Sequence, residues 1–447
     1  MWDSRPPDAW ENRQQPFGVA EKVRRVMRRG KEARPVDGMV IPAAGEQDCD
    51  VPPHVLFGVD RLCGDLSYLG GARRVGLATN DAARLARDVS RRSRVAMLDA
   101  GVPIVRLFGP EHGLGAAAAD GASVLDSTDS LTGLPVISLY GERLRPTRES
   151  LGDLDAVLFD IPDIGTRFYT YIWTLYHLMA ACADAAVPLI VLDRPNPLGG
   201  DLTRAEGPLL EPACRSFIGE DTIPVRHQLT LGELARLWQR ERFPLASLHI
   251  VLCSEWRRSM SWPDTGLPWV PTSPAMPTFE SAQVYPGTCV FEATNLSIGR
   301  GTDAPFQLVG APWLDSGLVL RELARLVPGG VACRAVQFTP ATPPHANVVC
   351  QGIHVSNPDP AVLGIVAFGL LLLAAIVRTH AEHFRWNTYP TAANPSGAGH
   401  FERLLGRRDI RGAYDVAPLS IDVERVRAWT TTADWSARVR DVLCYDA

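Results

Sequence analysis

Carboxylates and an imidazole follow two short apolar segments in the first half of this 447-residue chain. The segment IVRLF is followed by Glu111 and His112, and the segment AVLF is followed by Asp160 and Asp163. Apolar segments of this length are typical of strands that are buried on both faces of a parallel sheet. Ligands of such sheets bind outside the carboxyl ends of the strands. We therefore take these four residues as the candidate catalytic groups.

Glu111 has the most favourable position for acid–base chemistry. It follows Pro110 and precedes His112 and Gly113, and the glycine allows the chain to turn sharply. A carboxyl group that is partly removed from water has a raised pKa and can act as a general acid. His112 would orient Glu111 or bind a substrate hydroxyl. The alternatives are a glutamate that only caps the next turn and an ordinary structural histidine.

The second strand end has two acidic residues and a basic one. Asp160 and Asp163 lie on either side of a proline turn, and Arg167 follows four residues after Asp163. Two close carboxylates shift each other's pKa, and Arg167 would keep one of them ionised. An Asp–Arg pair that fixes a loop would explain the same residues. Tyr169 would line a sugar-binding surface, because its ring suits the apolar face of a sugar, or would belong to the core.

Further polar residues follow a third expected strand or lie in a glycine-rich segment farther along the chain. Each is a weak signal alone, and only their convergence on one face would make a binding site. These residues are Arg194, Asn196, Glu206, Arg226, His227, Asn295, Arg300 and Thr302. Arg300 stands between two glycines, where its guanidinium could grip a substrate carboxylate through two hydrogen bonds.

Strand and helix patterns alternate through the first half of the chain, which predicts parallel βαβ units and an α/β fold with a doubly wound sheet. The expected strands are residues 74–80, 104–108, 134–140, 156–160, 187–193 and 249–253, and the expected helices are 81–100, 147–152, 171–186 and 230–240. Residues 262–313 are dense in Pro, Gly and Trp and are expected to form a wall over the strand ends. Later helices at 318–326, 361–378 and 423–429, with a strand at 348–355, predict a smaller α+β domain.

The chain is predicted to contain an extension and two domains. Residues 1–54 have the polar composition of a poorly ordered extension. Residues 55–254 would form the doubly wound domain, and residues 255–447 the smaller domain that closes a cleft. The apolar run 361–377 is short for a bilayer span and is expected to be a buried helix, so no membrane partner is expected.

Composition argues against several classes of function. A net charge of −5 gives no global surface for nucleic acid or membrane. The nine cysteines form no CxxC pair, which favours reduced thiols in a cytoplasm, and the N-terminus lacks the pattern of a secretory signal. No GxGxxG follows the first strand, and GxxxxGKS/T and GxSxG are absent. We expect no cofactor and no metal, and the oligomeric state stays open.

Ordered motifs over roughly residues 55 to 445 resemble a bacterial family long described as a domain of unknown function and now associated with exo-β-N-acetylmuramidase activity. The matching strings are FGPEHGLG (108–115), LPVISLYG (134–141), FDIPDIGTRFYTY (159–171), LDRPNPLGG (192–200), SFIGEDTIPVRHQLTLGELA (216–235), WVPTSP (269–274), YPGTCVFEATNLSIGRGTDAPFQLVGAPW (285–313) and FERLLG (401–406).

The resemblance implies a Rossmann-like domain joined to a smaller auxiliary domain, with the active site in the cleft between them. It also implies a glycosidase that removes a β-linked N-acetylmuramic acid from the non-reducing end of peptidoglycan fragments or muropeptides, without a nucleotide or metal cofactor. Glu111 is then the expected general acid/base, tuned by His112, with Asp160 as the second carboxylate and Asp163 as its alternative. The sugar would be held by Arg167, Tyr169, Arg194, Asn196, Glu206, Arg226, His227, Glu292, Asn295, Arg300 and Thr302.

Four residues depart from the family pattern near the expected cleft, namely Pro162, Gln228, Ala275 and Ile298. They leave two other functions open. One is a glycan-binding sensor that has lost turnover, and the other is a biosynthetic tailoring enzyme that acts on a different glycoside. The expected cytoplasmic location favours intracellular recycling of cell-wall fragments or a tailoring role.

Overall fold

The computed structural model describes residues 55–327, 333–356 and 363–446, and its largest element is a seven-stranded sheet. The strand order is β3-β4-β2-β1-β5-β6-β7, and all neighbours are parallel except β3 and β4. The strands are β1 (Val75–Thr79), β2 (Ile104–Gly109), β3 (Ser127–Thr128), β4 (Pro135–Ser138), β5 (Ala156–Asp160), β6 (Leu189–Leu192) and β7 (Leu248–Val251). Because the chain winds from β1 first to one side and then to the other, the predicted doubly wound, Rossmann-like sheet is confirmed.

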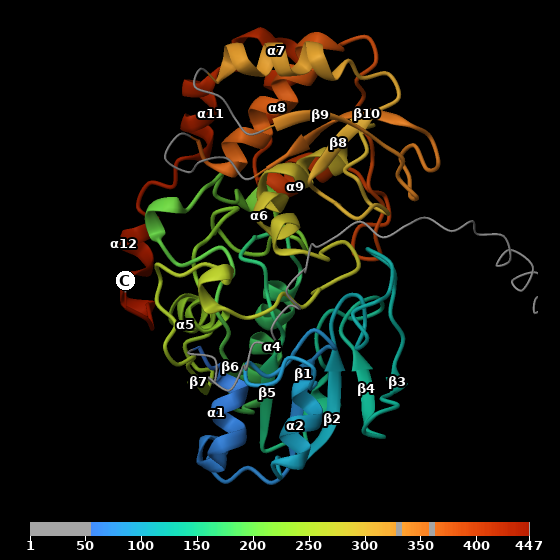
Figure 1. The fold of residues 1–447 in the computed structure, drawn as a ribbon. Helices are drawn as coiled ribbons and strands as arrows, with labels where there is room; N and C mark the ends of the chain where they lie inside the picture. The colour runs from blue at the N-terminus through green and yellow to red at the C-terminus, as the bar shows by residue number, and fades with distance from the viewer. Residues whose placement is uncertain (1–54, 328–332, 357–362, 447) are drawn as a thin grey trace, which may run out of the picture. The chain divides into compact units, whose positions relative to one another are not determined.

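Helices cover both faces of this sheet (Figure 1). Helices α1 (Gly58–Gly64) and α2 (Ser93–Asp99) pack on one face, and α3 (Arg148–Leu151), α4 (Tyr171–Ala185) and α5 (Leu231–Glu241) pack on the other. Alternate residues of β5 point to opposite faces of the sheet. Leu158 belongs to the hydrophobic cluster on the side of α1 and α2, and Val157 and Phe159 belong to the cluster on the side of α4 and α5. Both faces of the central strands are therefore buried, which explains their unbroken apolar sequence.

The helix expected over residues 81–100 was wrong in its first half, because α2 begins only at Ser93. The carboxylate of Asp60 accepts hydrogen bonds from the backbone N–H groups of Ala86 and Arg87. The side chain of Asn80 accepts one from the N–H of Ala82. These side chains satisfy the backbone donors of an irregular loop and so compete with helix formation.

The second part of the chain forms a smaller antiparallel sheet with helices, which confirms the predicted second domain. Its strands, in the order β8-β10-β9, are β8 (Leu308–Ala311), β9 (Cys333–Phe338) and β10 (Cys350–Val355). Its helices are α6 (Phe279–Thr288), α7 (Ser316–Leu326), α8 (Ile365–Thr379), α9 (His400–Leu405), α10 (Asp409–Val416) and α11 (Val423–Thr430). The last helix, α12 (Trp435–Val439), lies beside α5 of the large-sheet domain, where Arg438 pairs with Glu241 (Figure 1). Short 3-10 helices are η1 (Leu66–Leu69), η2 (Leu202–Arg204), η3 (Pro212–Cys214), η4 (Trp262–Thr265), η5 (Cys289–Ala293), η6 (Pro418–Ser420) and η7 (Arg440–Val442).

The segment 262–313 contains more regular structure than its sequence indicated. It includes η4, α6, η5 and β8. Helix α6 contains Pro286 and Gly287, two residues that normally argue against a helix. It begins where the side chain of Thr278 accepts a hydrogen bond from the N–H of Ser281, and its apolar residues are buried. Tertiary packing therefore outweighs the weak local helix propensity of this segment.

Helix α8 is the apolar run that the sequence analysis expected to be a buried helix. Every residue from Ile365 to Val377 is buried, and residues 361 and 362 of the predicted helix lie outside the described part of the chain. None of the helices within the described ranges is long and apolar enough to cross a membrane. A Cβ atom built on Gly369 of α8 would lie 1.9 Å from the carbonyl oxygen of Gly287 in α6. Glycine at this position thus allows the two helix backbones to approach closely.

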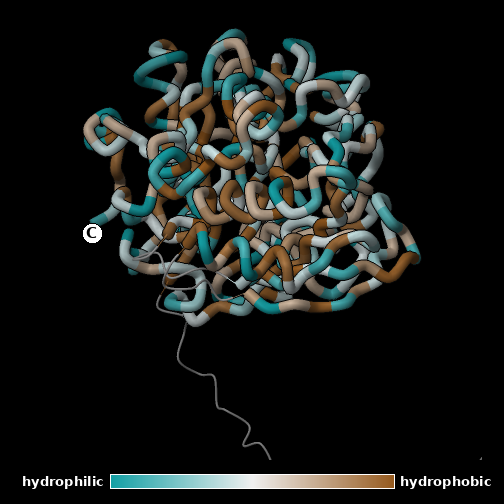
Figure 2. Tube along the Cα trace, turned by 90° about the horizontal axis from the view of Figure 1, so that it is seen from above, coloured by the Kyte–Doolittle hydropathy of each residue, from teal (hydrophilic) through white to brown (hydrophobic). Residues whose placement is uncertain are grey.

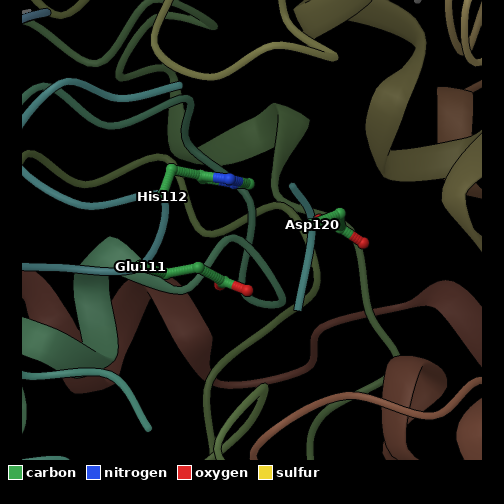
Figure 3. A group of neighbouring side chains, drawn as sticks. All are labelled: Glu111, His112 and Asp120. Atoms are coloured by element: carbon green, nitrogen blue, oxygen red, sulfur yellow. The ribbon is translucent and has the colours of Figure 1, made fainter. Parts of the chain in front are cut away.

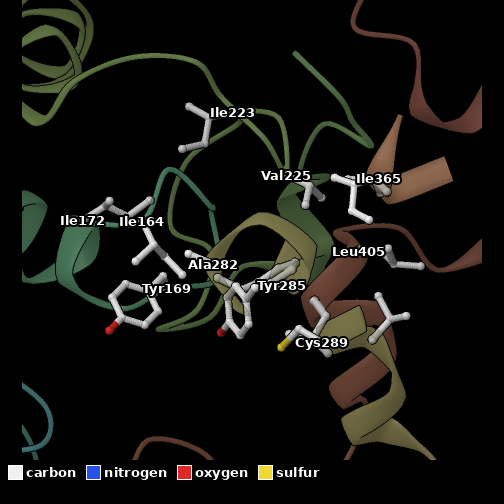
Figure 4. Packing of buried hydrophobic residues seen from close by; sticks show 14 of the residues in the cluster. Ile164, Tyr169, Ile172, Ile223, Val225, Ala282, Tyr285, Cys289, Ile365 and Leu405 are labelled. Carbon is white, nitrogen blue, oxygen red and sulfur yellow. The ribbon is translucent and has the colours of Figure 1, made fainter. Parts of the chain in front are cut away.

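One hydrophobic cluster runs from the large sheet into the small-sheet domain. Figure 4 shows part of it, with Ile164 and Ile172 on one side and Ile365 and Leu405 on the other. Hydrophobic segments of the trace run mostly through the interior, as Figure 2 shows. The last residues return to the large sheet, where the hydroxyl of Tyr445 donates to Asp193. The domain boundary at 254/255 stays a prediction, and the predicted extension 1–54 lies outside the described residues.

We predict that Gly369→Ala lowers the free energy of unfolding by more than about 2 kcal/mol, because the added methyl group must displace helix backbone. The matched control is Gly412→Ala, in the exposed face of α10, where a Cβ meets nothing within 4 Å. That change should leave stability equal or raise it by up to about 1 kcal/mol. Urea unfolding of both variants measures the difference, and equal stabilities would contradict the close helix contact.

Candidate active site

A cavity lies between the loops after the large sheet and the small-sheet domain, and it includes about 610 Å³ of space with its mouth. Its ionisable lining residues are Glu111, His112, Asp120, Glu292, Arg300 and His400. Its aromatic lining residues are Tyr140, Phe168, Tyr169, Phe217, Tyr285, Phe306 and Tyr389.

Glu111 comes directly after β2 and is only 5% exposed. Its Oε1 accepts a hydrogen bond of 3.0 Å from the N–H of Gly121, and its Oε2 accepts one of 2.6 Å from the hydroxyl of Thr170. Burial, and then the negative charge of Asp120, raise the pKa of Glu111 above its ordinary value. The raised pKa favours the protonated form of Glu111, which is the form that donates a proton.

His112 and Gly113 make the sharp turn after Glu111, with φ angles of 64° and 71°. A left-handed conformation is costly for a histidine, at about 1–3 kcal/mol, and such strain gathers at functional sites. The Nδ1 atom of His112 lies 2.8 Å from the carbonyl oxygen of Ala118. Because a carbonyl oxygen can only accept, Nδ1 carries a proton. Figure 3 shows the imidazole together with Glu111 and Asp120.

Asp120 belongs to an ionic network that covers one side of the cavity. Its Oδ2 lies 3.4 Å from Nη2 of Arg300 and accepts a hydrogen bond of 2.5 Å from the hydroxyl of Tyr389. Arg300 also donates to Oε1 of Glu292 at 2.5 Å, and Oε2 of Glu292 lies 3.1 Å from Nε2 of His400. Burial alone would raise the pKa of Asp120, but Arg300 and Tyr389 outweigh it, so this pKa lies below its ordinary value.

Aromatic rings form another part of the wall. The ring of Tyr285 lies 4.5 Å from that of Phe306, 5.3 Å from that of Phe168 and 5.9 Å from that of Tyr169, centre to centre. The hydroxyl of Tyr169 is 2.6 Å from the hydroxyl of Thr272 (Tyr169 and Tyr285 are labelled in Figure 4). Rings with attached hydroxyls suit a sugar, which has apolar ring faces and polar edges.

Asp160 does not line this cavity. It is fully buried at the end of β5, and its Oδ1 accepts a hydrogen bond of 2.7 Å from Nε of Arg194. Arg194 also donates to the carbonyl oxygen of Arg84. The structure therefore does not bring the expected second carboxylate to Glu111, because Asp160 pairs with a buried arginine instead.

Asp163 lines a second cavity together with Pro162 and Arg194. Burial raises the pKa of Asp163 to about 7 and, together with the charge of Arg167, lowers the pKa of His227 to about 3. Oδ2 of Asp163 and Nε2 of His227 are 3.8 Å apart. Because Nδ1 of His227 accepts from a backbone N–H, the neutral ring carries its proton on Nε2, facing Asp163.

Arg167 does not pair with Asp163, so the expected Asp–Arg pair was wrong. Its guanidinium is fully buried and donates to the carbonyl oxygens of Pro208, Ile223 and Leu404 at 2.7 to 2.8 Å. Three neutral acceptors around one guanidinium fix the backbone rather than a substrate.

The other expected binding residues divide into two groups. Tyr169, Glu292 and Arg300 line the cavity. The remainder lie outside its lining and bond to the protein: Glu206 accepts N–H groups at the start of α8, and Asn295 and Thr302 bond backbone groups of nearby loops. The residues outside the lining are Arg167, Arg194, Asn196, Glu206, Arg226, His227, Asn295 and Thr302. Of the four departures from the family pattern, only Ala275 lines the cavity.

Sequence reasoning missed several lining residues. Asp120 ends a run of alanines without periodicity, and Tyr389 and His400 are more than 250 residues away from Glu111 along the chain. The sequence contains no local signal that joins them. Only the position of Thr170, next to Tyr169 in the second candidate motif, could have been inferred.

The closest ligand atoms of Glu111, His112 and Asp120 all lie within 4.8 Å of one another. Carboxylate oxygens and an imidazole nitrogen at this spacing can also bind a divalent cation. Here both oxygens of Glu111 accept hydrogen bonds from the protein, and Arg300 already balances Asp120. This arrangement favours proton transfer between an acid and a base.

The fold and this cavity agree with the comparisons with known proteins. The family profile described as "Exo-beta-N-acetylmuramidase NamZ, N-terminal" matches residues 75–280, and the corresponding C-terminal profile matches residues 283–445. The chain therefore belongs to the exo-β-N-acetylmuramidase NamZ family, as its motifs predicted. It is 40% identical to the peptidoglycan β-N-acetylmuramidase NamZ of Bacillus subtilis (strain 168) over 361 residues, which are 80% of this chain and 84% of that protein.

Two crystal structures of DUF1343 family proteins from Bacteroides fragilis NCTC 9343 have the same fold. One matches with a TM-score of 0.76 at 30% identity and covers 88% of this chain and 100% of its own. The other matches with a TM-score of 0.67 at 25% identity and covers 88% and 99%. These matches confirm the predicted fold class.

We predict that Asp163→Asn stabilises the protein increasingly as the pH rises from about 4 to about 7. Folded Asp163 keeps its proton up to about pH 7, whereas the ordinary value is 3.8, so wild-type stability falls over this range and then levels off. Asparagine does not titrate and does not incur this loss. Urea unfolding at pH 4 and pH 8 should show a gain of more than about 1 kcal/mol only at pH 8.

The control for this prediction is Asp160→Asn. It leaves the buried Arg194 without its charged partner, so it should destabilise the protein at pH 8 by about 3–5 kcal/mol. Equal effects of the two substitutions at pH 8 would contradict the different surroundings of these two carboxyl groups.

Proposed function

We propose that this protein is a glycoside hydrolase that releases a β-linked N-acetylmuramic acid from the non-reducing end of peptidoglycan fragments. The observation that carries the proposal is a buried glutamate with a raised pKa in an aromatic-walled cavity, in a chain of the NamZ family. Glycosidases need one carboxyl group that is protonated at working pH and can give its proton to the leaving oxygen. Glu111 has the raised pKa that such a group needs.

Glu111 serves as the general acid in this proposal. Its carboxyl group is held by Gly121 and Thr170, so the proton is presented in a fixed direction. His112 acts as a neighbouring positioning group through the turn that it shares with Glu111. Tyr169 and Tyr285 pack against the apolar face of the sugar ring. Arg300 already pairs with two carboxylates, and we propose that it holds Asp120 and Glu292 in place.

We further propose that the protein works in the cytoplasm on recycled cell-wall fragments. All eight cysteines in the described ranges are free thiols, and thiols persist in reducing compartments. Fractionation of the native cells, with an antibody against this chain, tests the location. Recovery of the protein from the medium or the cell surface would contradict the cytoplasmic assignment.

The main test of function is release of N-acetylmuramic acid from a β-1,4-linked MurNAc–GlcNAc disaccharide. We predict that the wild type turns over and that Glu111→Gln reduces kcat by at least about 100-fold, because the amide cannot donate the proton. The matched control is Glu382→Gln, an exposed glutamate outside the cavity, which should keep wild-type kcat.

Other outcomes of this test separate the alternatives. Saturable binding of the disaccharide without turnover would identify a glycan-binding protein. Turnover of another glycoside but not of the muramoyl disaccharide would identify a tailoring enzyme. Ala275, which replaces the family residue in the cavity lining, is the position that motivates this second comparison.

A further inference from the structure

Three carboxylates line the cavity within the described residues, namely Glu111, Asp120 and Glu292, and they differ in how far they are engaged. Glu292 has a side chain that is 6% exposed, and its two oxygens contact Arg300 and His400. Both of its oxygens are therefore already engaged by the protein. The side chain of Asp120 is 34% exposed, and only its Oδ2 is engaged by Arg300 and Tyr389. Oδ1 of Asp120 accepts no hydrogen bond from any described residue.

The spacing of Glu111 and Asp120 brings two carboxyl groups to one point of the cavity. Their closest oxygens lie within 4.8 Å of each other. In retaining glycosidases the two carboxyl groups are the closer pair and one of them attacks the sugar directly, whereas inverting enzymes hold them farther apart to admit a water molecule. The close approach of this pair agrees with direct attack by the second carboxylate.

The surroundings of the two carboxyl groups shift their pKa values in opposite directions. Burial and the nearby negative charge favour the protonated form of Glu111, so its pKa is raised. Partial burial opposes ionisation of Asp120, but Arg300 and the hydroxyl of Tyr389 favour the ionised form, so its pKa is lowered. Two carboxyl groups whose pKa values are pushed apart in one cavity are typical of an acid and a nucleophile.

We propose that Asp120 is the catalytic nucleophile of this glycosidase and that hydrolysis retains the β configuration. The inference rests on the proposed function and deepens it by assigning the second carboxylate. Tyr389 and Arg300 are positioning residues that hold Oδ2 of Asp120 and leave Oδ1 to react.

In the first step, Oδ1 of Asp120 attacks the anomeric carbon of the terminal sugar, and a bond between them forms. The bond from that carbon to the glycosidic oxygen breaks, and its electron pair goes to the leaving oxygen, which takes the proton of Glu111. In the second step, a water molecule attacks the anomeric carbon and gives a proton to the Glu111 carboxylate. As the bond from the water oxygen forms, the bond to Asp120 breaks and returns its electron pair to the aspartate.

The stereochemistry of wild-type turnover is the first test. We use 4-nitrophenyl β-N-acetylmuraminide in buffer with methanol and determine the anomer of the methyl glycoside by NMR, because a methyl glycoside does not mutarotate. The methyl β-glycoside is expected. The methyl α-glycoside would overturn the proposal, although release of the sugar would still support the proposed function. Absence of any turnover, on this substrate and on the disaccharide, would instead contradict the proposed function itself.

The second test assigns the nucleophile, because retention could also arise from the N-acetyl oxygen of the substrate. Asp120→Ala should hydrolyse the aryl glycoside at least about 100-fold more slowly than wild type, and added azide should restore release of 4-nitrophenol with the α-glycosyl azide as product. Glu111→Ala is the matched control, since azide attacking the covalent intermediate should give the β-glycosyl azide. Failure of azide to give the α-product with Asp120→Ala would overturn the proposal.

A milder variant keeps the proposal testable if Asp120→Ala does not fold. Tyr389→Phe removes the hydrogen bond to Oδ2 and leaves the ring in place. Ionised Asp120 is required, so activity is lost as the pH falls through its pKa, and loss of the hydrogen bond raises that pKa. The acid limb of the kcat/KM profile should therefore move to higher pH. An unchanged acid limb would contradict the assigned role of Asp120.

Discussion

The buried guanidinium of Arg167 holds together the two parts of the protein between which the cavity lies. It follows the end of β5 and donates to the carbonyl oxygens of Pro208 and Ile223, and it also reaches Leu404 at the end of α9. Helix α9 begins with His400, which lines the cavity. A fully buried guanidinium needs these acceptors, because an unpaired buried charge is costly. The orientation of α9 relative to the large sheet is therefore fixed by hydrogen bonds rather than by hydrophobic packing alone.

Hydrophobic packing supplies the second constraint on the cavity. Helices α6 and α8 approach so closely that Gly287 and Gly369 leave no room for a methyl group. The start of α8 is held by Glu206, whose carboxylate accepts hydrogen bonds from the N–H groups of Val366 and Ala367. Because α6 leads directly into η5, which contains Glu292, the position of the helix pair determines where this carboxylate meets Arg300.

Within the cavity, charge balance separates carboxyl groups of the same chemical type. Glu111 is buried beside the negative charge of Asp120, whereas Asp120 faces a guanidinium and a phenol. Asp160 is fully buried and pairs with Arg194, and Asp163 is nearly buried and faces a neutral histidine. The neighbouring side chains therefore determine the chemical role of each carboxyl group.

The sequence alone determined the large sheet, the turn that presents Glu111 and His112, and the family. Buried parallel strands have a continuous apolar pattern, and a Pro–Glu–His–Gly turn is encoded by adjacent residues, so both are visible locally. Helix α6 and the loop after β1 were misjudged, because side-chain hydrogen bonds and packing from distant segments outweigh local propensity there. Only the tertiary structure showed that Asp120, Tyr389 and His400 line the same cavity as Glu111. It also showed that Asp160 lies outside this cavity and pairs with Arg194. These contacts depend on which loops, distant along the chain, meet at the ends of the strands, and residue spacing in the sequence does not predict that.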